Sequence, residues 1–105
     1  MRRNESIMAY IDVIIMKNQN KAIRHLNNKD ESSAEILLEE NLVLDPSNNA
    51  AYDLLLDIYK KQDDYQKMIS LLNKAVKYCK TKNKYYREIK KVLVLDKILK
   101  DMNSI

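Results

Sequence analysis

The most informative stretch of this 105-residue sequence covers residues 42–76 and reads LVLDPSNNAAYDLLLDIYKKQDDYQKMISLLNKAV. It holds the single proline of a chain that contains no glycine. Proline disfavours helical backbone at the residue before it and has no N–H to donate, so a helix that arrives here should end by Leu44. One of the three polar residues 47–49 can then cap the helix that follows. The stretch therefore predicts two helices that meet in a short turn at Pro46.

Apolar residues after this turn recur at the three-to-four spacing of amphipathic helices. A helix over residues 50–61 should bury Tyr52, Leu55, Leu56 and Tyr59. The polar residues 62–66 interrupt the pattern, and Asp63 and Gln66 have the spacing of a capping box for the next helix. That helix should bury Met68, Ile69, Leu71, Leu72, Ala75 and Val76. Together the two segments predict a helical hairpin.

The same spacing extends toward both ends of the chain. An N-terminal apolar stripe runs through Ile7, Tyr10, Ile11, Ile14, Ile15, Ala22, Ile23 and Leu26. The polar residues 17–20 interrupt this stripe, so one long helix and two short ones are both compatible with it. Asp30 can cap a second helix, whose apolar positions are Ala34, Ile36, Leu37, Leu38 and Leu42. A last helix over residues 84–102 should turn inward Tyr86, Ile89, Val92, Leu93, Ile98 and Leu99.

Composition excludes several classes of protein. The hydrophobic share of 46% and the charged share of 32% indicate one globular domain rather than a disordered chain. An all-β fold would need many glycine- and proline-rich turns, which the sequence lacks. The apolar run at residues 7–16 contains Asp12 and is too short to span a bilayer, so no membrane association is expected. Cys79 is the single cysteine, which fits a reducing, cytoplasmic location.

Residues that lie 34 positions apart match in chemical kind. The matched pairs include Leu37/Leu71, Leu38/Leu72, Leu42/Val76, Tyr52/Tyr86, Leu55/Ile89 and Tyr59/Leu93. A fixed period of this length, with two helices per unit, is typical of a helical solenoid. Each helix pair would have an apolar face that only a neighbouring pair can cover, so such units stack.

Residues 50–80 resemble a tetratricopeptide repeat, whose first helix carries an aromatic residue, a leucine and a tyrosine at set positions. Tyr52, Leu55 and Tyr59 stand at these positions, and Leu72 and Ala75 fit positions in the second helix. Three residues depart from the family pattern: Leu56 replaces its glycine, Met68 its alanine and Lys80 its proline. Residues 15–48 are similar to a weaker copy, with Asn18 in place of the aromatic residue and His25 in place of the tyrosine.

This resemblance implies an all-α fold in which antiparallel helical hairpins stack as a short tetratricopeptide-like solenoid with a C-terminal capping helix. The single domain 1–105 would comprise a leading helix at 4–16, repeats at 15–48 and 49–82, and the capping helix at 83–105. Pro46 would end the first repeat so that the next helix can turn back and stack. An ordinary bundle of five helices with chance periodicity is the alternative.

No constellation of residues indicates an enzyme. His25 is the single histidine, and no serine or cysteine accompanies it in a known motif. Cys79 lies near a helix end among lysines, which can lower a thiol pKa, although the role of a small buried hydrophobe is favoured. Pairs of carboxylates one helical turn apart, such as Asp53 and Asp57, are typical of solvated faces. Since CxxC, HExxH and glycine-rich motifs are missing, no catalytic residue, metal or cofactor is expected.

Charge is unevenly distributed along the chain. Residues 30–45 carry six acidic and no basic side chains, whereas residues 74–91 carry eight basic side chains and one acidic one. Four interpretations are open: two solvated faces, a basic surface for an acidic protein segment, a nucleic-acid contact, and head-to-tail self-association. In the nucleic-acid interpretation the lysines would bind phosphates and Tyr85 would stack on bases, since Tyr86 is expected to pack inside.

The resemblance also implies a binding surface, because the first helix of each tetratricopeptide repeat lines a concave groove that holds peptides. The corresponding partner-binding residues are Gln19, Asn20, Ile23, Asp53, Leu54, Asp57, Lys84, Arg87, Glu88 and Lys91. The family's clamp for a terminal carboxylate is not expected here. Only Lys84 matches it, whereas Asp53 and Asp57 would repel a carboxylate and Glu88 stands where an arginine is needed.

These features predict a protein-interaction module, namely a small adaptor or chaperone-like subunit. It would bind a peptide or helix segment of a protein partner through its concave face or through an exposed apolar end. Homodimerisation through residues 7–16 would be a further way to bury the leading helix. The alternative is an RNA- or ribosome-associated small protein that uses the basic residues 74–91.

Overall fold

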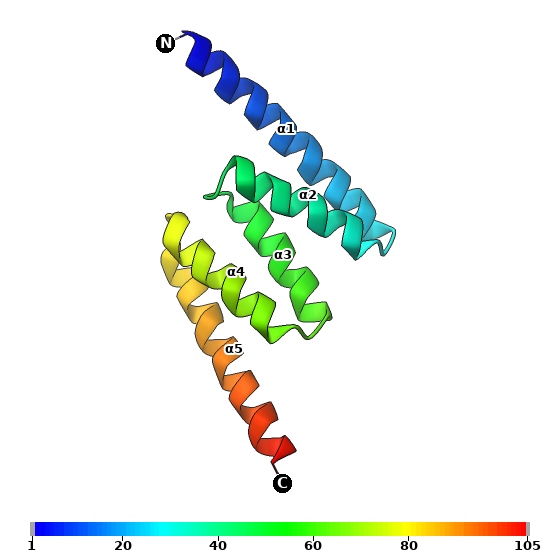
Figure 1. The fold of residues 1–105 in the computed structure, drawn as a ribbon, viewed down its shortest axis with the longest axis vertical. Coiled ribbons are helices and arrows are strands. Elements are labelled where there is room, and N and C mark those ends of the chain that lie inside the picture. The colour runs from blue at the N-terminus through cyan, green and yellow to red at the C-terminus, as the bar shows by residue number, and fades with distance from the viewer. Residues whose placement is uncertain (1, 105) are drawn as a thin grey trace.

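The computed structural model describes the backbone of residues 2–104 and the side chains of residues 6–104 (Figure 1). It contains five helices, which are α1 (Arg2–Asn27), α2 (Glu31–Leu44), α3 (Asn49–Lys61), α4 (Tyr65–Tyr78) and α5 (Lys82–Asn103). The predicted all-α fold is therefore confirmed, and residues 2–104 contain no strand. Within this range, no helix combines the length and the apolar run that crossing a bilayer requires.

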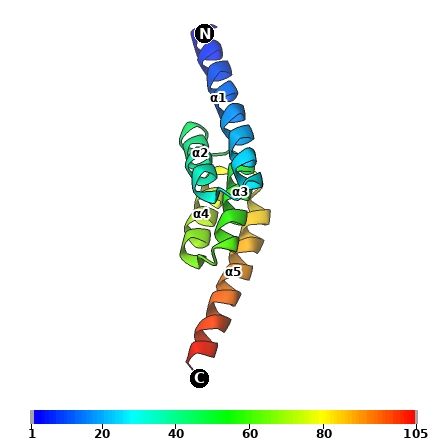
Figure 2. The same cartoon turned by 90° about the vertical axis from the view of Figure 1, so that its right-hand side faces the viewer.

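The extensive helix contacts join neighbours in the chain, from α1 with α2 through to α4 with α5. In the side view, α2 and α4 form one layer, and α1, α3 and α5 form the other (Figure 2). The N-terminal half of α1 and the C-terminal half of α5 project from the stack at opposite ends (Figure 1). The molecule measures 62 × 31 × 15 Å, and its radius of gyration is 16.0 Å. A compact chain of this length would have a radius of roughly 13 Å.

The turn at Pro46 separates α2 from α3 as the sequence predicts. Helix α2 ends at Leu44, and the side chain of Asn48 caps α3 by accepting a hydrogen bond from the backbone N–H of Ala51 at 3.2 Å. The hydroxyl of Tyr52 donates to the carbonyl oxygen of Pro46 at 2.7 Å. The first aromatic residue of α3 therefore also fixes the turn that precedes it.

The caps of α2 and α4 give one confirmation and one correction. Asp30 caps α2 as predicted, because its carboxylate accepts a hydrogen bond from the backbone N–H of Ser33. The predicted capping box that begins at Asp63 is wrong, since Asp64 caps α4 by accepting from Lys67 N–H at 3.1 Å. Asp63 instead adopts a left-handed conformation with φ 53°, which reverses the chain after α3. The turn between α3 and α4 is therefore one residue longer than a cap at Asp63 would make it.

Helix α1 is one continuous helix, so the polar residues 17–20 do not divide it. The predicted leading helix at 4–16 is the first half of α1 and not a separate element. Its apolar stripe is only partly covered, because Ile7, Tyr10 and Ile23 are exposed whereas Ala22 is buried. The part of α1 nearest to the N-terminus therefore lies outside the core.

The core lies between the two layers and is centred on α3. All four predicted residues of α3, Tyr52, Leu55, Leu56 and Tyr59, are buried. The predicted inward side of α4 is confirmed as well, by buried Met68, Leu71, Leu72 and Ala75 and by Ile69 and Val76, which pack against the core. Helix α2 contributes Ala34, Leu38 and Leu42.

The predicted inward face of α5 is wrong by one residue at its start. Tyr85 is fully buried, with its ring edge-on to that of Tyr52 at a centroid distance of 6.1 Å, whereas Tyr86 is 51% exposed. Helix α5 begins 33 residues after α3, because three residues join α4 to α5 and four join α2 to α3. The shorter joint rotates the inward position from Tyr86 to Tyr85.

Farther along α5 the prediction holds for Val92, which is buried, and for Ile89, which packs against the core. Leu93, Ile98 and Leu99 are exposed, which contradicts the inward positions predicted for them. Leu93 directly follows buried Val92, so its exposure repeats the one-residue shift seen at Tyr85. Ile98 and Leu99 belong to the last turns of α5, whose C-terminal half projects beyond α4 (Figure 1).

Candidate protein-binding surfaces

The ten residues predicted to bind a partner lie on α1, α3 and α5, the three helices of one layer. On α1, Asn20 and Ile23 are exposed and Gln19 is half-buried. On α3, Asp57 is exposed, and Asp53 and Leu54 are half-buried. On α5, Glu88 is half-buried and the other three residues, Lys84, Arg87 and Lys91, are exposed. The predicted set thus occupies a common layer and is largely accessible.

The structure joins the α3 and α5 members of this set through Asp53. The ammonium of Lys84 lies 2.7 Å from one carboxylate oxygen of Asp53, and the hydroxyl of Tyr85 donates to the other at 3.2 Å. The same ammonium lies 5.3 Å from the centre of the Tyr85 ring. Asp53 is therefore already occupied by groups of α5 and is less available to a partner than its sequence position suggested.

Glu88 is neutralised in a similar way. Its carboxylate lies 3.3 Å from the ammonium of Lys60 on α3 and 3.6 Å from that of Lys91 on α5. Exposed ion pairs of this kind contribute about 0–1 kcal/mol each to stability. Their main effect here is on the surface, because acidic and basic side chains of the predicted site cancel one another. No hydrogen bond or ion pair within residues 6–104 connects Gln19, Asn20 or Ile23 to α3 or α5.

A buried amide pair, which the sequence pattern did not predict, fixes α2 on α1. Asn18 donates to the side-chain oxygen of Asn41 at 3.0 Å, and Asn41 donates to the carbonyl oxygen of Ile15 at 3.0 Å. Asn41 is 1% exposed. The sequence contained a signal for this pair, because each asparagine occupies an inward position of an apolar stripe. Asn18 lies between Ile15 and Ala22, and Asn41 lies between Leu38 and Leu42.

The N-terminal half of α1 carries an uncovered apolar face. Ile7, Ile11 and Ile15 follow one another at four-residue spacing and continue the line of Asn18 and Ala22, which α2 covers. Toward the N-terminus of α1 the exposure of this face rises, and Ile7 and Met8 are 56% and 59% exposed. Three further large apolar side chains of this half, Tyr10, Val13 and Met16, are also exposed but lie on other sides of the helix.

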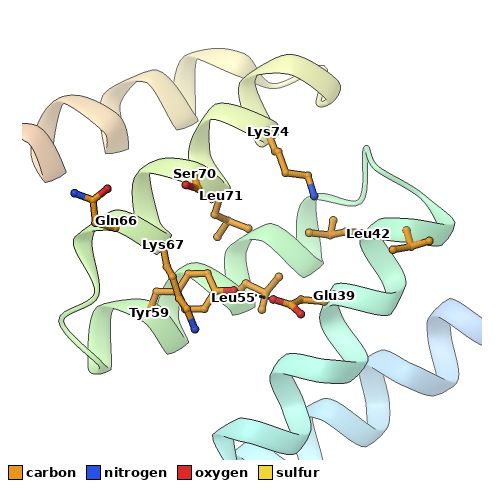
Figure 3. A pocket seen from close by; sticks show the side chains of 10 residues that line it. Glu39, Leu42, Leu55, Tyr59, Gln66, Lys67, Ser70, Leu71 and Lys74 are labelled. Atoms are coloured by element: carbon orange, nitrogen blue, oxygen red, sulfur yellow. Dashed lines mark hydrogen bonds between the residues drawn. The ribbon is translucent and has the colours of Figure 1, made fainter.

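A hollow of about 480 Å³ lies between α2 and α4, in the layer opposite to the predicted site (Figure 3). Helix α2 supplies Glu39, Leu42 and Val43 to it, and α3 supplies Leu55 and Tyr59. Helix α4 supplies Gln66, Lys67, Ser70, Leu71 and Lys74. Sequence reasoning missed this hollow because it assigned the second helix of each hairpin to packing alone.

Tyr59 links the floor of this hollow to both of its walls. Its hydroxyl donates to a carboxylate oxygen of Glu39 at 3.2 Å, and the ammonium of Lys67 lies 5.3 Å from the centre of its ring. Lys67 also lies 3.5 Å from a carboxylate oxygen of Glu35. Burial raises the pKa of Tyr59 well above its usual value, and the nearby carboxylates of Glu35 and Glu39 raise it further. The hydroxyl therefore acts as a hydrogen-bond donor.

The surroundings of Cys79 make its thiol less reactive than an exposed one. Cys79 is buried, its sulfur lies 3.7 Å from the carbonyl oxygen of Ser47, and burial raises the pKa of its thiol. A buried thiol with a raised pKa is a poor nucleophile. Within the same range, no three His, Cys, Asp or Glu side chains are placed so that they could hold a metal ion.

Comparisons of this chain with known proteins give no relative. No family model, no curated protein and no solved structure matches it.

Proposed function

We propose that this chain is a protein-interaction module, a small adaptor or chaperone-like subunit, which binds a helix of another protein along the N-terminal half of α1. One observation carries the proposal: the apolar face that α2 covers continues past the end of α2 without a cover. Ile7 and Met8, which are 56% and 59% exposed, lie on this continuation.

The nature of the occupant follows from the neighbouring interface. Helix α2 has 14 residues and α1 has 26, so α2 covers only part of the stripe. A second helix laid on the rest of this stripe would extend a helix–helix interface that already exists. Full burial of an isoleucine or methionine side chain contributes roughly 1.5–3 kcal/mol. Several such side chains can offset the cost of association, which is about 4–15 kcal/mol.

The sequence resemblance supports the same class of function. Residues 50–80 resemble a tetratricopeptide repeat, and that family binds protein segments. Two such hairpins are few, because repeats of this kind gain stability from stacking against neighbours. A partner helix on α1 would add a neighbour at the N-terminal end. The buried Cys79 fits a reducing compartment, and we place the module in the cytoplasm.

The test compares the chain with an Ile7→Asp variant in affinity purification followed by reconstitution from purified components. Ile7 lies outside the core, so the variant should keep the helical circular dichroism and the urea unfolding midpoint. We expect it to lose one defined protein that the unchanged chain retains in high salt. Leu95→Asp, an equivalent change on the projecting end of α5, is the matched control and should keep that protein.

Two results would contradict the proposal. One is a partner that Ile7→Asp and Leu95→Asp retain equally well, and the other is a monomer that forms no complex at all. Sedimentation equilibrium distinguishes a second copy of this chain from another protein, since a homodimer sensitive to Ile7→Asp would place a copy of α1 on the same face.

Nucleic-acid binding is the second candidate, and the position of Tyr86 favours it. Tyr86 is 51% exposed, and Lys82 and Lys90 lie one turn before and after it on the same side of α5. The residue available to stack is thus Tyr86 and not Tyr85. Binding of single-stranded RNA should then weaken steeply with salt and be lost in a variant with Lys82, Lys84, Lys90 and Lys91 changed to Glu. A salt-independent affinity would contradict this candidate.

A further inference from the structure

The walls of the hollow between α2 and α4 carry opposite charges. Helix α2 contains four acidic residues and no basic one, whereas α4 contains three lysines and no acidic residue. Glu39 faces the hollow from α2, and Lys67 and Lys74 face it from α4 (Figure 3). This layer lies opposite to the surface predicted from the sequence, and α1 does not line the hollow.

One end of the hollow is closed and the other is open. The ion pair between Lys67 and Glu35 joins the two walls near the first turns of α2 and α4. Farther along both helices, Lys74 forms no ion pair within the described residues, and Val43 is 81% exposed. An apolar rim and an unpaired ammonium therefore face each other across the open end.

The lining between these charges is mostly apolar, and Ser70 of α4 is its polar member. Leu42 and Leu71 come from the two walls and Leu55 from the floor, and the side chains of all three converge on the hollow (Figure 3). Ile36 lies two turns before Val43 on the same side of α2 and is 67% exposed. A ligand that fills the hollow can therefore extend its apolar contact along α2.

An extended peptide is a poor occupant, because the walls are helices whose own backbone groups are already hydrogen-bonded. They offer no edge with which an extended backbone could pair, and unpaired backbone groups are costly to bury. A helix satisfies its own backbone and needs only an apolar ridge for the hollow. That ridge fixes the rotation of the helix, and the opposed charges then determine its direction, since a basic flank is attracted to α2 and an acidic flank to α4.

We infer that the hollow between α2 and α4 is a docking site for an amphipathic helix of another protein, with an acidic side chain opposite Lys74 and a basic side chain opposite Glu39. This site is independent of the face proposed on α1. The reverse arrangement places like charges against each other on both walls. The hollow thus selects one of the two directions in which the helix can lie.

The experiment uses a display library of 18-residue helical peptides selected on the full chain. Positions i, i+3, i+4 and i+7 are kept apolar, and both flanks are randomised among Glu, Lys and Gln. The selected peptides should carry lysine on one flank and glutamate on the other. Their affinity, measured by fluorescence anisotropy, should fall about tenfold or more with Lys74→Glu. It should fall to a similar extent with Val43→Asp.

Two matched comparisons make the result specific. Lys77→Glu is the same change on the same helix, but the Lys77 ammonium lies over the Tyr78 ring and outside the hollow, so it should leave the affinity unchanged. A peptide whose glutamate flank is changed to lysine should recover binding to the Lys74→Glu variant. Recovery by charge exchange identifies direct contact, because a variant that merely fails to fold cannot be rescued by a peptide.

Several outcomes would overturn the inference. Selected peptides without charge asymmetry would refute the directional part of it, and equal losses with Lys74→Glu and Lys77→Glu would show a general charge effect. Peptides that lose binding with Ile7→Asp but not with Val43→Asp would occupy the α1 face instead. That last result would support the proposed function while rejecting this site, so the two failures are distinguishable.

Discussion

The buried side-chain amide of Asn41 forms hydrogen bonds through both its oxygen and its nitrogen. It accepts from Asn18 and donates to the carbonyl oxygen of Ile15, so its rotation and that of α1 are fixed together. Apolar side chains in the same place would pack at several rotations. The pair therefore contributes to the specificity of the α1–α2 contact, in addition to its modest net stability.

The consequence is a strongly non-additive pair of substitutions. Asn18→Ala leaves a buried oxygen of Asn41 without its donor, and we expect the free energy of unfolding to fall by about 1–3 kcal/mol. Asn18→Leu combined with Asn41→Leu removes both partners and should cost much less than the sum of the single changes. Urea unfolding of the unchanged chain, the single Asn18→Leu and Asn41→Leu variants and the double variant tests this, with exposed Asn73→Ala as the control. Additive losses would contradict the coupling.

Three buried tyrosines make the stability sensitive to alkaline pH. Burial raises the pKa of Tyr52 to about 12 and raises that of Tyr59 and Tyr85 still further. In the unfolded chain these groups titrate near pH 10. The stabilisation is therefore complete below about pH 10 and is lost as pH rises toward the pKa of each group in the folded state.

We expect the urea unfolding midpoint to decline once the pH exceeds about 10. A variant with Tyr52→Phe and Tyr85→Phe should show a shallower decline, because phenylalanine does not titrate. The midpoint of each protein is compared with its own value at neutral pH, because Tyr52→Phe also removes the hydrogen bond from the Tyr52 hydroxyl to Pro46. Equal slopes for the two proteins above pH 10 would contradict this cause.

The helices end as they do because polar residues and proline are placed at their boundaries. Asp30, Asn48 and Asp64 cap three of the five helices through side-chain oxygens. The chain has no glycine, so residues with side chains must supply the left-handed conformations of its turns. Lys29 at φ 60° and Asp63 at φ 53° do so, at a cost that glycine would not incur.

Glycine at these two positions should stabilise the protein or leave it unchanged. Relief of the left-handed strain of Lys29 is partly offset by the greater freedom of glycine in the unfolded chain, so we expect a net gain of about 1 kcal/mol or less. Glu40→Gly, at an exposed position inside α2, should instead destabilise by about 1 kcal/mol. Thermal unfolding of Lys29→Gly, Asp63→Gly and Glu40→Gly checks the sign at each position. Destabilisation by Lys29→Gly would refute the strain argument.

For the individual helices, the sequence predicted much of the fold. The end of α2 and the inward residues of α3 and α4 followed from proline chemistry and helical periodicity, both of which are local. The register of α5 did not follow, because it depends on a joint that is one residue shorter than its counterpart. The continuity of α1 was open for a similar reason, since the role of Asn18 depends on Asn41, a residue of another helix.

The whole molecule is a stack in which the extensive helix contacts join neighbours in the chain. Helix α3 lies in the middle with a covered surface on each side, whereas α1 and α5 lie at the two ends of the stack (Figure 1). Local opening in such a stack should start at the two ends, where few buried contacts oppose it. Stability is therefore expected to be graded along the chain.

Hydrogen exchange measured by mass spectrometry should reveal this gradient. Amides of α3 should exchange slowest, and those of the projecting halves of α1 and α5 fastest. Leu55→Ala, which removes a fully buried side chain, should lower protection across all helices and cost about 2–5 kcal/mol. Ile7→Ser should change only local exchange in α1. Uniform protection over all five helices would contradict the graded picture.

The surfaces of the whole molecule were less predictable than its elements. The resemblance selected ten residues that do share one layer, but the pairing of Asp53 with Lys84 and of Glu88 with Lys60 depends on the rotation of α5. The hollow between α2 and α4 combines two helices that are separated in sequence by α3. A prediction from the repeat period and the family pattern treats one hairpin at a time and therefore does not reveal the hollow.

The chain-neighbour pattern of contacts also bears on biosynthesis. Every helix after the first packs against the segment made just before it, so no helix must wait for a distant part of the polypeptide. Topologies dominated by such short-range pairing assemble rapidly. Each hairpin can therefore close soon after it leaves the ribosome, and apolar surface becomes buried in the order in which the chain is translated.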